Sequence, residues 1–314
     1  MLGMYFGFGA GDALTQWADQ HQLPITLAHE FGDSRYWSYF ETGTNFGSWA
    51  GWVAARAGRR FSYSCPLLPG LDDPDLTHPQ KYAKLAAGDY DSHFTLLGQT
   101  FAGYPALHDT FVRLGWEFNG AAWPWSVPPD DQTTLNNYKT GFNRAAAALK
   151  AACPTLQIEW CPNCQLDYTD RTFADMYPGN TWIDVIGIGA YDYYWPGGAP
   201  GWPGTPQTPD DLWRFIRDGA RGHNGLRDQV ALARANGKQL AHTEWGVWDL
   251  DTAFAFGGGD NPHFIDRIAD WHEQHRYLYQ VYNNFNPGDS RHFLDDFPET
   301  KNRYLLRHRN PMNP

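Results

Sequence analysis

The sequence predicts an α/β protein, a single-domain (β/α)8 TIM barrel spanning residues 1–314. Short apolar runs alternate with helical stretches along the whole chain, and eight such runs can be counted. The runs are apolar almost throughout, which is typical of parallel strands that helices cover on both faces. Eight strand–helix units fit a barrel of ~250 residues and leave the rest of the chain for longer loops.

Each predicted strand is a short apolar run bounded by turn residues. The runs are shorter than an ordinary helix, and they contain many β-branched and aromatic residues. In chain order, the predicted strands are Met4–Gly9, Ile25–His29, Arg60–Pro66, Thr110–Trp116, Leu156–Pro162, Ile183–Tyr191, Gln239–Trp245 and Tyr277–Asn283.

The stretches between the strands place apolar residues at helical spacing. A proline- and glycine-rich segment, Trp195–Pro209, is predicted as a long loop after the sixth strand and not as a domain boundary. In chain order, the predicted helices are Asp12–His21, Asn45–Ala57, Gln80–Phe101, Thr134–Ala152, Phe173–Tyr177, Asp210–Asn236, Pro262–His275 and Glu299–Arg307.

A doubly wound sheet is the rival fold for such an alternation. That fold usually places a glycine-rich phosphate-binding turn after its first strand. The segment Gly7–Gly11 matches the turn only in part, because Asp12 stands where the third glycine should fall. The barrel is therefore the favoured prediction.

Composition excludes several classes of function. The formal charge of −11, from 24 basic and 35 acidic residues, argues against a nucleic-acid-binding protein. No apolar run approaches the ~20 residues that a membrane-spanning helix needs, so no membrane span is expected. Aromatic residues make up 16% of the chain and include 15 tryptophans, which suit either a core or a cleft that stacks on flat ligands.

The cysteines and the N-terminus carry weaker signals. Cys161 and Cys164 form a lone C-x-x-C motif with no second ligand pair, so no metal and no other cofactor is expected. The thiols are expected to be buried or joined in one local disulfide. The opening segment, Met1–Asp12, lacks a basic region and a cleavage site, which leaves open a cytoplasmic protein or a secreted one whose signal peptide has been removed. We expect a monomer.

Polar residues gather where two predicted strands end, which is where barrels place their chemistry. The fourth strand leads into Glu117 and the seventh into Glu244, so the two carboxylates are expected on the same rim. A carboxylic acid that protonates a leaving oxygen, beside a carboxylate that attacks or activates water, suits glycoside hydrolysis. Taken singly, either glutamate could instead pair with Arg113 or cap a helix.

The motifs around these strand ends resemble glycoside hydrolase family 26, the β-mannanase family of clan A. Three segments carry the resemblance: Arg113–Trp125 (RLGWEFNGAAWPW), Ile183–Asp192 (IDVIGIGAYD) and Thr243–Gly246 (TEWG). Their order and spacing extend the resemblance over most of the chain. The first and last motifs together are fairly specific, whereas either alone would be weak.

The resemblance implies a retaining double displacement, with Glu117 as the general acid/base and Glu244 as the nucleophile. It also implies that Tyr191 hydrogen-bonds the nucleophile. Two positions depart from the family pattern, because Trp116 stands where mannanases usually have His and Gly189 where they commonly have Asp. We therefore expect the reaction type of the family, and a glycan specificity that can differ from mannan.

Further residues at the strand ends and in the adjoining loops are predicted to bind substrate. Amide groups can hydrogen-bond sugar hydroxyls and indoles can stack on pyranose rings, although ordinary packing is an equal alternative for each tryptophan. Strand alternation predicts that His242 shares a face with Glu244, or else is a core histidine. His29, Glu30 and Asp33 could line a distal subsite or serve as a cap or loop ion pair. The predicted substrate-binding residues are Arg113, Trp116, Asn119, Trp123, Trp125, Asn163, His242, Trp245, Trp248 and Asn283, and Trp160 and Trp195 are also expected at the rim.

The sequence thus predicts an endo-acting retaining glycoside hydrolase, whose partner is a poly- or oligosaccharide and whose substrate is a β-mannan or a related β-glycan. A non-catalytic carbohydrate-binding barrel is one alternative, and activity on mixed-linkage glucan, xylan or arabinan is another. A metal-dependent hydrolase would need an early His-x-His strand, which the first strand lacks. Retention predicts that the two carboxyl groups lie roughly 5–5.5 Å apart.

Overall fold

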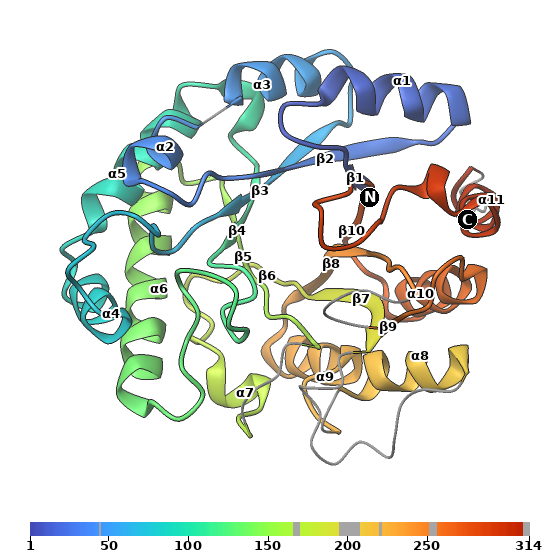
Figure 1. Cartoon of the computed structure of the whole chain (residues 1–314). Coiled ribbons are helices and arrows are strands. Elements are labelled where there is room, and N and C mark those ends of the chain that lie inside the picture. The colour runs from blue at the N-terminus through green and yellow to red at the C-terminus, as the bar shows by residue number, and fades with distance from the viewer. Residues whose placement is uncertain (44, 166–169, 195–207, 220–221, 251–255, 310–314) are drawn as a thin grey trace.

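The structure of the protein is a computed structural model, and it describes residues 1–43, 45–165, 170–194, 208–219, 222–250 and 256–309. Parallel strands form a closed ring, and helices surround the ring on its outside (Figure 1). The ring closes where β10 pairs with both β1 and β8. The predicted (β/α)8 barrel is therefore confirmed.

The strands keep the predicted order. Their bounds are β1 (Leu2–Tyr5), β2 (Ile25–Phe31), β3 (Arg60–Cys65), β4 (Phe111–Leu114), β5 (Gln157–Trp160), β6 (Val185–Ile186), β7 (Gly189–Tyr194), β8 (Gln239–Val247), β9 (Phe256–Gly257) and β10 (Tyr279–Asn283). β9 pairs antiparallel with β7 and was not predicted.

The helices lie between the strands. Their bounds are α1 (Gly11–His21), α2 (Trp37–Glu41), α3 (Phe46–Ala54), α4 (His78–Ala87), α5 (Asp91–Ala102), α6 (Gln132–Ala152), α7 (Phe173–Met176), α8 (Pro209–Asp218), α9 (Leu226–Asn236), α10 (Pro262–His275) and α11 (Pro298–His308), with short 3-10 turns η1 (Pro105–Leu107) and η2 (Leu294–Asp296).

Two predicted helices are each divided in the structure. The stretch 80–101 forms α4 and α5, because Gly88 adopts φ +97° and caps α4 with bonds from its N–H to Lys84 O and Leu85 O. Glycine enters this left-handed region without the steric cost that other residues meet. The stretch 210–236 forms α8 and α9, with Gly219 directly after α8. Most of the predicted Trp195–Pro209 loop lies outside the described residues.

The sixth barrel strand is interrupted, and the interruption shapes the rim. β6 pairs with β5, whereas β7 pairs with β8 after a break of two residues. At the break, Gly189 N–H donates to Pro162 O at 2.9 Å, and Cys164 N–H donates to Gly189 O at 3.0 Å. These bonds bring the segment after β5 against the start of β7, beside the end of β4.

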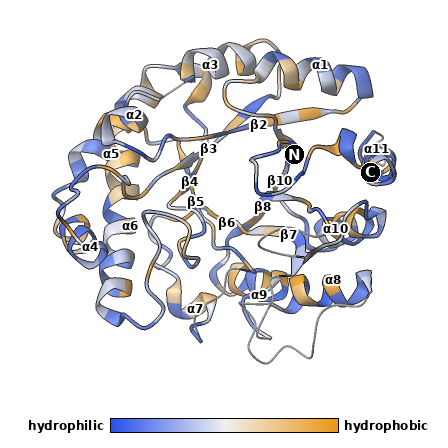
Figure 2. Ribbon diagram, in the orientation of Figure 1, coloured by the Kyte–Doolittle hydropathy of each residue, from blue (hydrophilic) through white to orange (hydrophobic). Residues whose placement is uncertain are grey.

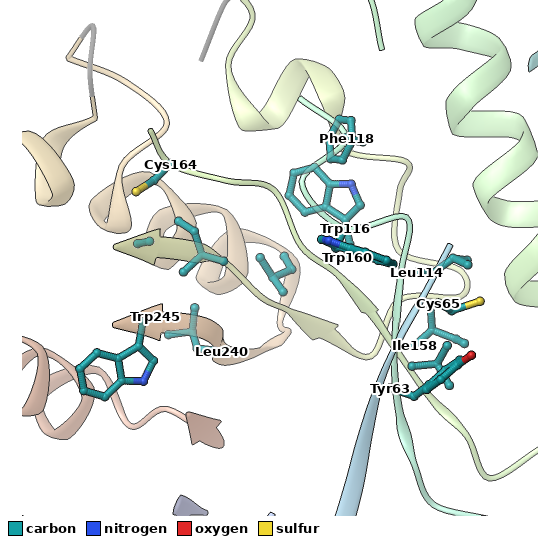
Figure 3. Packing of buried hydrophobic residues seen from close by; sticks show 14 of the residues in the cluster. Tyr63, Cys65, Leu114, Trp116, Phe118, Ile158, Trp160, Cys164, Leu240 and Trp245 are labelled. Carbon is teal, nitrogen blue, oxygen red and sulfur yellow. The ribbon is translucent and has the colours of Figure 1, made fainter. Parts of the chain in front are cut away.

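The core lies between the ring and the helices, whose apolar residues face inward (Figure 2). Trp116, Phe118 and Trp160 gather in one part of it (Figure 3). The prediction that Trp160 lies at the rim is wrong, because the ring is fully buried and its indole N–H donates to Tyr138 Oη at 2.9 Å. The four cysteines are buried free thiols. Within the described ranges, none of the helices combines the length and the apolar character needed to span a bilayer.

Candidate active site

Two glutamates that follow or lie on non-adjacent strands of the barrel meet at one buried arginine. Arg113, on β4, is fully buried, and its Nη1 lies 2.5 Å from Oε2 of Glu244 on β8. Its Nη2 lies 3.8 Å from Oε1 of Glu117. Arg113 thus forms the ion pairs that were the alternative interpretation of each glutamate. These contacts bring both carboxylates to the same place.

Glu117 lies just beyond the end of β4, in an unusual backbone conformation. Its φ is +53°, a region that residues with a side chain seldom adopt. Its N–H donates to Cys161 O at 2.8 Å, which ties the turn to the segment after β5. Left-handed residues of this kind concentrate at functional sites, where the surrounding structure holds them.

The carboxyl group of Glu117 is buried among neutral donors. Asn163 Nδ2 donates to Oε1 at 2.7 Å, and the indole N–H of Trp123 donates to Oε2 at 3.3 Å. Burial raises the pKa of Glu117 to about 7, and the nearby Glu244 charge adds to the rise, whereas Arg113 and the two hydrogen bonds oppose it. Glu117 can therefore hold a proton near neutral pH and release it when its surroundings change.

Glu244 is held by two donors, one on each oxygen. Arg113 binds Oε2, and the hydroxyl of Tyr191 donates to Oε1 at 2.8 Å. Asn283 Nδ2 in turn donates to the Tyr191 oxygen at 2.5 Å. Because a tyrosine hydroxyl has a single proton, the bond from Asn283 leaves that proton directed at Glu244.

A bulge in β8 decides which of its side chains face the barrel interior. His242 pairs with Gln280 and Trp245 with Tyr282, so β8 has one more residue than β10 over this interval. Thr243 and Glu244 consequently both point inward, where Thr243 Oγ1 donates to the buried carboxylate of Glu159.

The bulge overturns the prediction that His242 shares a face with Glu244. His242 is fully buried on the outer side of the strand, where its Nδ1 lies 2.9 Å from Nε2 of His272 on α10. Trp245 follows the same direction and packs on Tyr282 and Tyr304, with ring centroids 5.0 and 6.1 Å away. Figure 3 shows Trp245 well apart from Trp116. Neither His242 nor Trp245 reaches the cavity.

The two glutamates line a cavity of about 1000 Å³. Most of the predicted site residues line it, together with aromatic side chains from β1, β2, β7 and the segment after β10. Predicted residues on its wall are Trp116, Glu117, Trp123, Asn163, Tyr191, Glu244, Trp248 and Asn283.

Three predicted binding residues lie behind that wall. Arg113 lies beneath the glutamates. Asn119 is buried, donating to Asn163 O at 2.7 Å and accepting from Asn163 N–H at 2.9 Å, so it positions the partner of Glu117. Trp125 is fully buried, and its ring lies parallel to that of Trp123 at 5.2 Å. The prediction that Trp125 stacks on a sugar is therefore replaced by a supporting role behind Trp123.

Several cavity residues escaped the sequence analysis. His292 is buried, and its ring centroid lies 4.9 Å from both Tyr191 and Trp248. Tyr193 adds a further aromatic face. The end of the first strand carries a signal for two others, because Tyr5 and Phe8 are aromatic residues at the point where this strand reaches the same rim. The missed cavity residues include Tyr5, Phe8, Phe31, Tyr193, Phe285 and His292.

The residues proposed for a distal subsite behave differently from one another. Asp33 lines the cavity, where it pairs with Arg35 at 2.5 Å. His29 is buried between Ser62 and Ser64, with both ring nitrogens 3.0 Å from a hydroxyl. Glu30 is buried, and its carboxylate accepts hydrogen bonds from Gly9 N–H and the Trp49 indole. Trp195 lies outside the described residues.

Comparisons with known proteins agree with the fold. No protein-family model and no curated protein sequence matches the chain. The chain is similar in structure to a Cellulomonas fimi endo-β-1,4-mannanase double mutant, with a TM-score of 0.66 and 14% identity over 99% of this chain and 71% of that one. It is also similar to the catalytic domain of a family 26 endo-β-1,4-mannanase from Bacillus sp. JAMB-750, with a TM-score of 0.60 and 15% identity over 98% and 88%.

A second glycosidase family shares the architecture. The family 53 catalytic domain from Ignisphaera aggregans matches with a TM-score of 0.52 and 15% identity, over 97% of this chain and 95% of that one. The resemblance to family 26 seen in the motifs is thus confirmed at the level of the fold.

Proposed function

We propose that this protein is a retaining glycoside hydrolase that cleaves within a polysaccharide chain, with Glu117 as the acid/base and Glu244 as the nucleophile. The observation that carries the proposal is the pair of unlike carboxyls around Arg113. One is buried among neutral donors with a pKa of about 7, and the other receives a hydrogen bond from one guanidinium nitrogen and another from a tyrosine hydroxyl. Retaining glycosidases need this division of labour.

The first half of the reaction transfers the sugar to the enzyme. A carboxylate oxygen of Glu244 attacks the anomeric carbon, and the bond from that carbon to the leaving oxygen breaks. Glu117 gives its proton to the leaving oxygen, so the shortened glycan departs as an alcohol and Glu117 becomes a carboxylate. Tyr191 and Arg113 hold Glu244 in place for the attack.

The second half returns the enzyme to its starting state. In the glycosyl ester Glu244 no longer carries a charge, so one of the two causes that raise the pKa of Glu117 has gone. The Glu117 carboxylate then takes a proton from water while the water oxygen attacks the anomeric carbon, and the ester bond to Glu244 breaks. The change of charge at Glu244 thus helps Glu117 act first as acid and then as base.

The lining of the cavity suits a polysaccharide whose pyranose rings present flat faces. Trp123 and Trp248 line its wall, and Asn163 and Asn283 supply amides. A Cβ at Gly189 would lie 2.4 Å from Glu117 Oε1, so Glu117 occupies the space that a larger residue would need. We propose β-mannan as the first substrate to test. Because Trp116 and Gly189 depart from the mannanase pattern, mixed-linkage glucan, xylan and arabinan follow.

A panel of these polysaccharides tests the proposal. We expect new reducing ends, an early fall in viscosity because cleavage is internal, and products that keep the anomeric configuration of the substrate by NMR. Inversion would contradict the assigned roles. Binding of a glycan without turnover, in the wild type as in Glu117→Ala and Glu244→Ala, would favour the carbohydrate-binding barrel instead.

A further inference from the structure

An aromatic wall lines the cavity at the ends of three neighbouring strands. It consists of Tyr5 at the end of β1, Phe8 just beyond it, Phe31 at the end of β2 and Phe285 beyond β10, and we call it the phenylalanine wall. Tyr5 lies at its centre, with ring centroids 4.9 Å from Phe31, 5.5 Å from Phe285 and 6.2 Å from Phe8. All three rings meet Tyr5 edge to face.

Phe8 is the exposed member of this wall. Its side chain is 65% exposed, and in the described part of the chain no other large apolar side chain that is this accessible lines the cavity. An aromatic ring left in water forgoes the ~1.5–3 kcal/mol that its burial would contribute. Packing therefore does not explain the residue, whereas a ligand that covers the ring would.

The loop that carries Phe8 is firmly held. Gly9 N–H donates at 2.6 Å to the buried carboxylate oxygen Oε2 of Glu30, and the same oxygen accepts from the Trp49 indole at 3.0 Å. The Asn45 amide completes the set at 3.2 Å. Hydrogen bonds to a buried carboxylate are among the stronger ones in proteins. The backbone next to Phe8 is thus anchored without a ligand.

The two residues that flank Phe8 adopt backbone conformations that favour glycine. Gly7 and Gly9 have φ values of +108° and +65°, so the turn suits glycine at both positions. A Cβ at Gly7 would lie 3.3 Å from the Phe285 ring, which shows how closely the turn approaches the wall. The loop therefore presents one exposed ring on a tight, anchored turn.

The wall borders the reaction centre without belonging to it. Tyr5 pairs in register with Asn283, whose side chain bonds the tyrosine that holds Glu244. Phe8 lies three residues beyond the end of β1, and its ring contacts that of Tyr5. A glycan bound at the glutamates can therefore extend along the same cavity toward Phe8.

We propose that Phe8 is the stacking platform of an additional sugar-binding subsite, away from the bond that is cleaved. This inference rests on the proposed function. The ring takes the apolar face of a pyranose, and Asp33, Ser34 and Asn45 at the cavity border supply partners for its hydroxyls. Recognition of a long chain then depends on Phe8, whereas recognition of a short one does not.

The test compares oligosaccharides of increasing length, from mannotriose to mannohexaose, or the corresponding glucan series if the panel shows faster hydrolysis of mixed-linkage glucan. In Phe8→Ala we expect kcat/KM for the hexasaccharide to fall about tenfold, mainly through KM, with the trisaccharide unchanged. Phe8→Trp should restore the long-chain activity. Leu71→Ala is the matched control, because Leu71 is 51% exposed and does not line the cavity.

The outcomes separate this subsite from the proposed function. An equal loss at every length, or no loss with the hexasaccharide, would overturn the subsite while the hydrolase stands. If the wild type hydrolyses no glycan, the proposed function fails, and calorimetric binding of mannohexaose to the wild type and Phe8→Ala still tests the subsite. Weaker binding by Phe8→Ala would then support it, and equal or undetectable binding by both proteins would reject it.

Discussion

Glu117 and Glu244 contact the same guanidinium, yet their surroundings differ in almost every other respect. Glu117 lies on a left-handed turn after β4 and receives hydrogen bonds from the neutral side chains of Asn163 and Trp123, with Arg113 at 3.8 Å. Glu244 lies on a bulged strand and receives a tyrosine hydroxyl and a guanidinium N–H at 2.5 Å. The surroundings of the two carboxyl groups, and not the residue type, thus support the proposed division into an acid and a nucleophile.

The largest effects on activity are expected when the two carboxylates are removed in turn. We expect Glu244→Ala to lower kcat by about 10⁴-fold or more, because no covalent intermediate can form. With azide as an added nucleophile, Glu244→Ala should form a glycosyl azide of inverted configuration, and Glu117→Ala one of retained configuration. The anomers can be assigned by NMR. The same anomer from both variants would show that the two glutamates do not have separate roles.

The pH dependence of kcat/KM tests the role proposed for Glu117. Catalysis needs the protonated acid, so kcat/KM should fall as the pH rises through about 7. Glu117→Gln should lower kcat by about 10²–10⁴-fold and abolish this alkaline limb. Aryl glycosides with good leaving groups should lose less, because their departure needs little protonation. A limb that persists in the variant would assign it to another group.

Gly189→Ala should disturb Glu117 while sparing Glu244. The added methyl group would meet Glu117 Oε1 at 2.4 Å, so the carboxyl group must move. We expect kcat to fall by about 10- to 100-fold, since small displacements of catalytic groups are costly. Gly246→Ala is the control on β8, where a Cβ would make an ordinary 3.4 Å contact with the Tyr191 ring. A similar loss in both variants would indicate a general packing effect.

Asn283→Asp should disturb Glu244 while sparing Glu117. An aspartate would accept the Tyr191 proton that now points at Glu244, so Glu244 would lose that hydrogen bond and kcat should fall about tenfold. Asn283→Asp in a Tyr191→Phe background separates this route from direct repulsion. If the loss of activity persists at full size without the hydroxyl, the new charge acts on Glu244 directly and not through Tyr191.

The barrel and its two glutamates could be predicted from the sequence because both follow from local pattern. Apolar runs identify the strands, and the rule that barrels place chemistry at the carboxyl ends of strands then identifies Glu117 and Glu244. The roles suggested by the family resemblance remain proposals, although the geometry around Tyr191 supports them. Helix boundaries were less accessible, because Gly88 ends a helix only if its backbone adopts the left-handed conformation.

The errors in the site come from contacts that no local pattern contains. His242 was placed by strict alternation, and the bulge in β8 depends on pairing with β10, which is distant in sequence. Trp125 is adjacent to the site in the chain but packs behind Trp123. The exposure of Phe8 likewise follows from the fold, which leaves its ring uncovered, and no local pattern indicates it.

The buried acid also makes the stability of the protein depend on pH. In the unfolded chain Glu117 would ionise near pH 4.5, whereas in the folded protein it keeps its proton up to about pH 7. Over that interval the folded state binds the extra proton, so the contribution of Glu117 to the free energy of unfolding falls as the pH rises. Glu117→Gln should therefore melt at a higher temperature than the wild type above pH 7, while it loses the turnover proposed for Glu117.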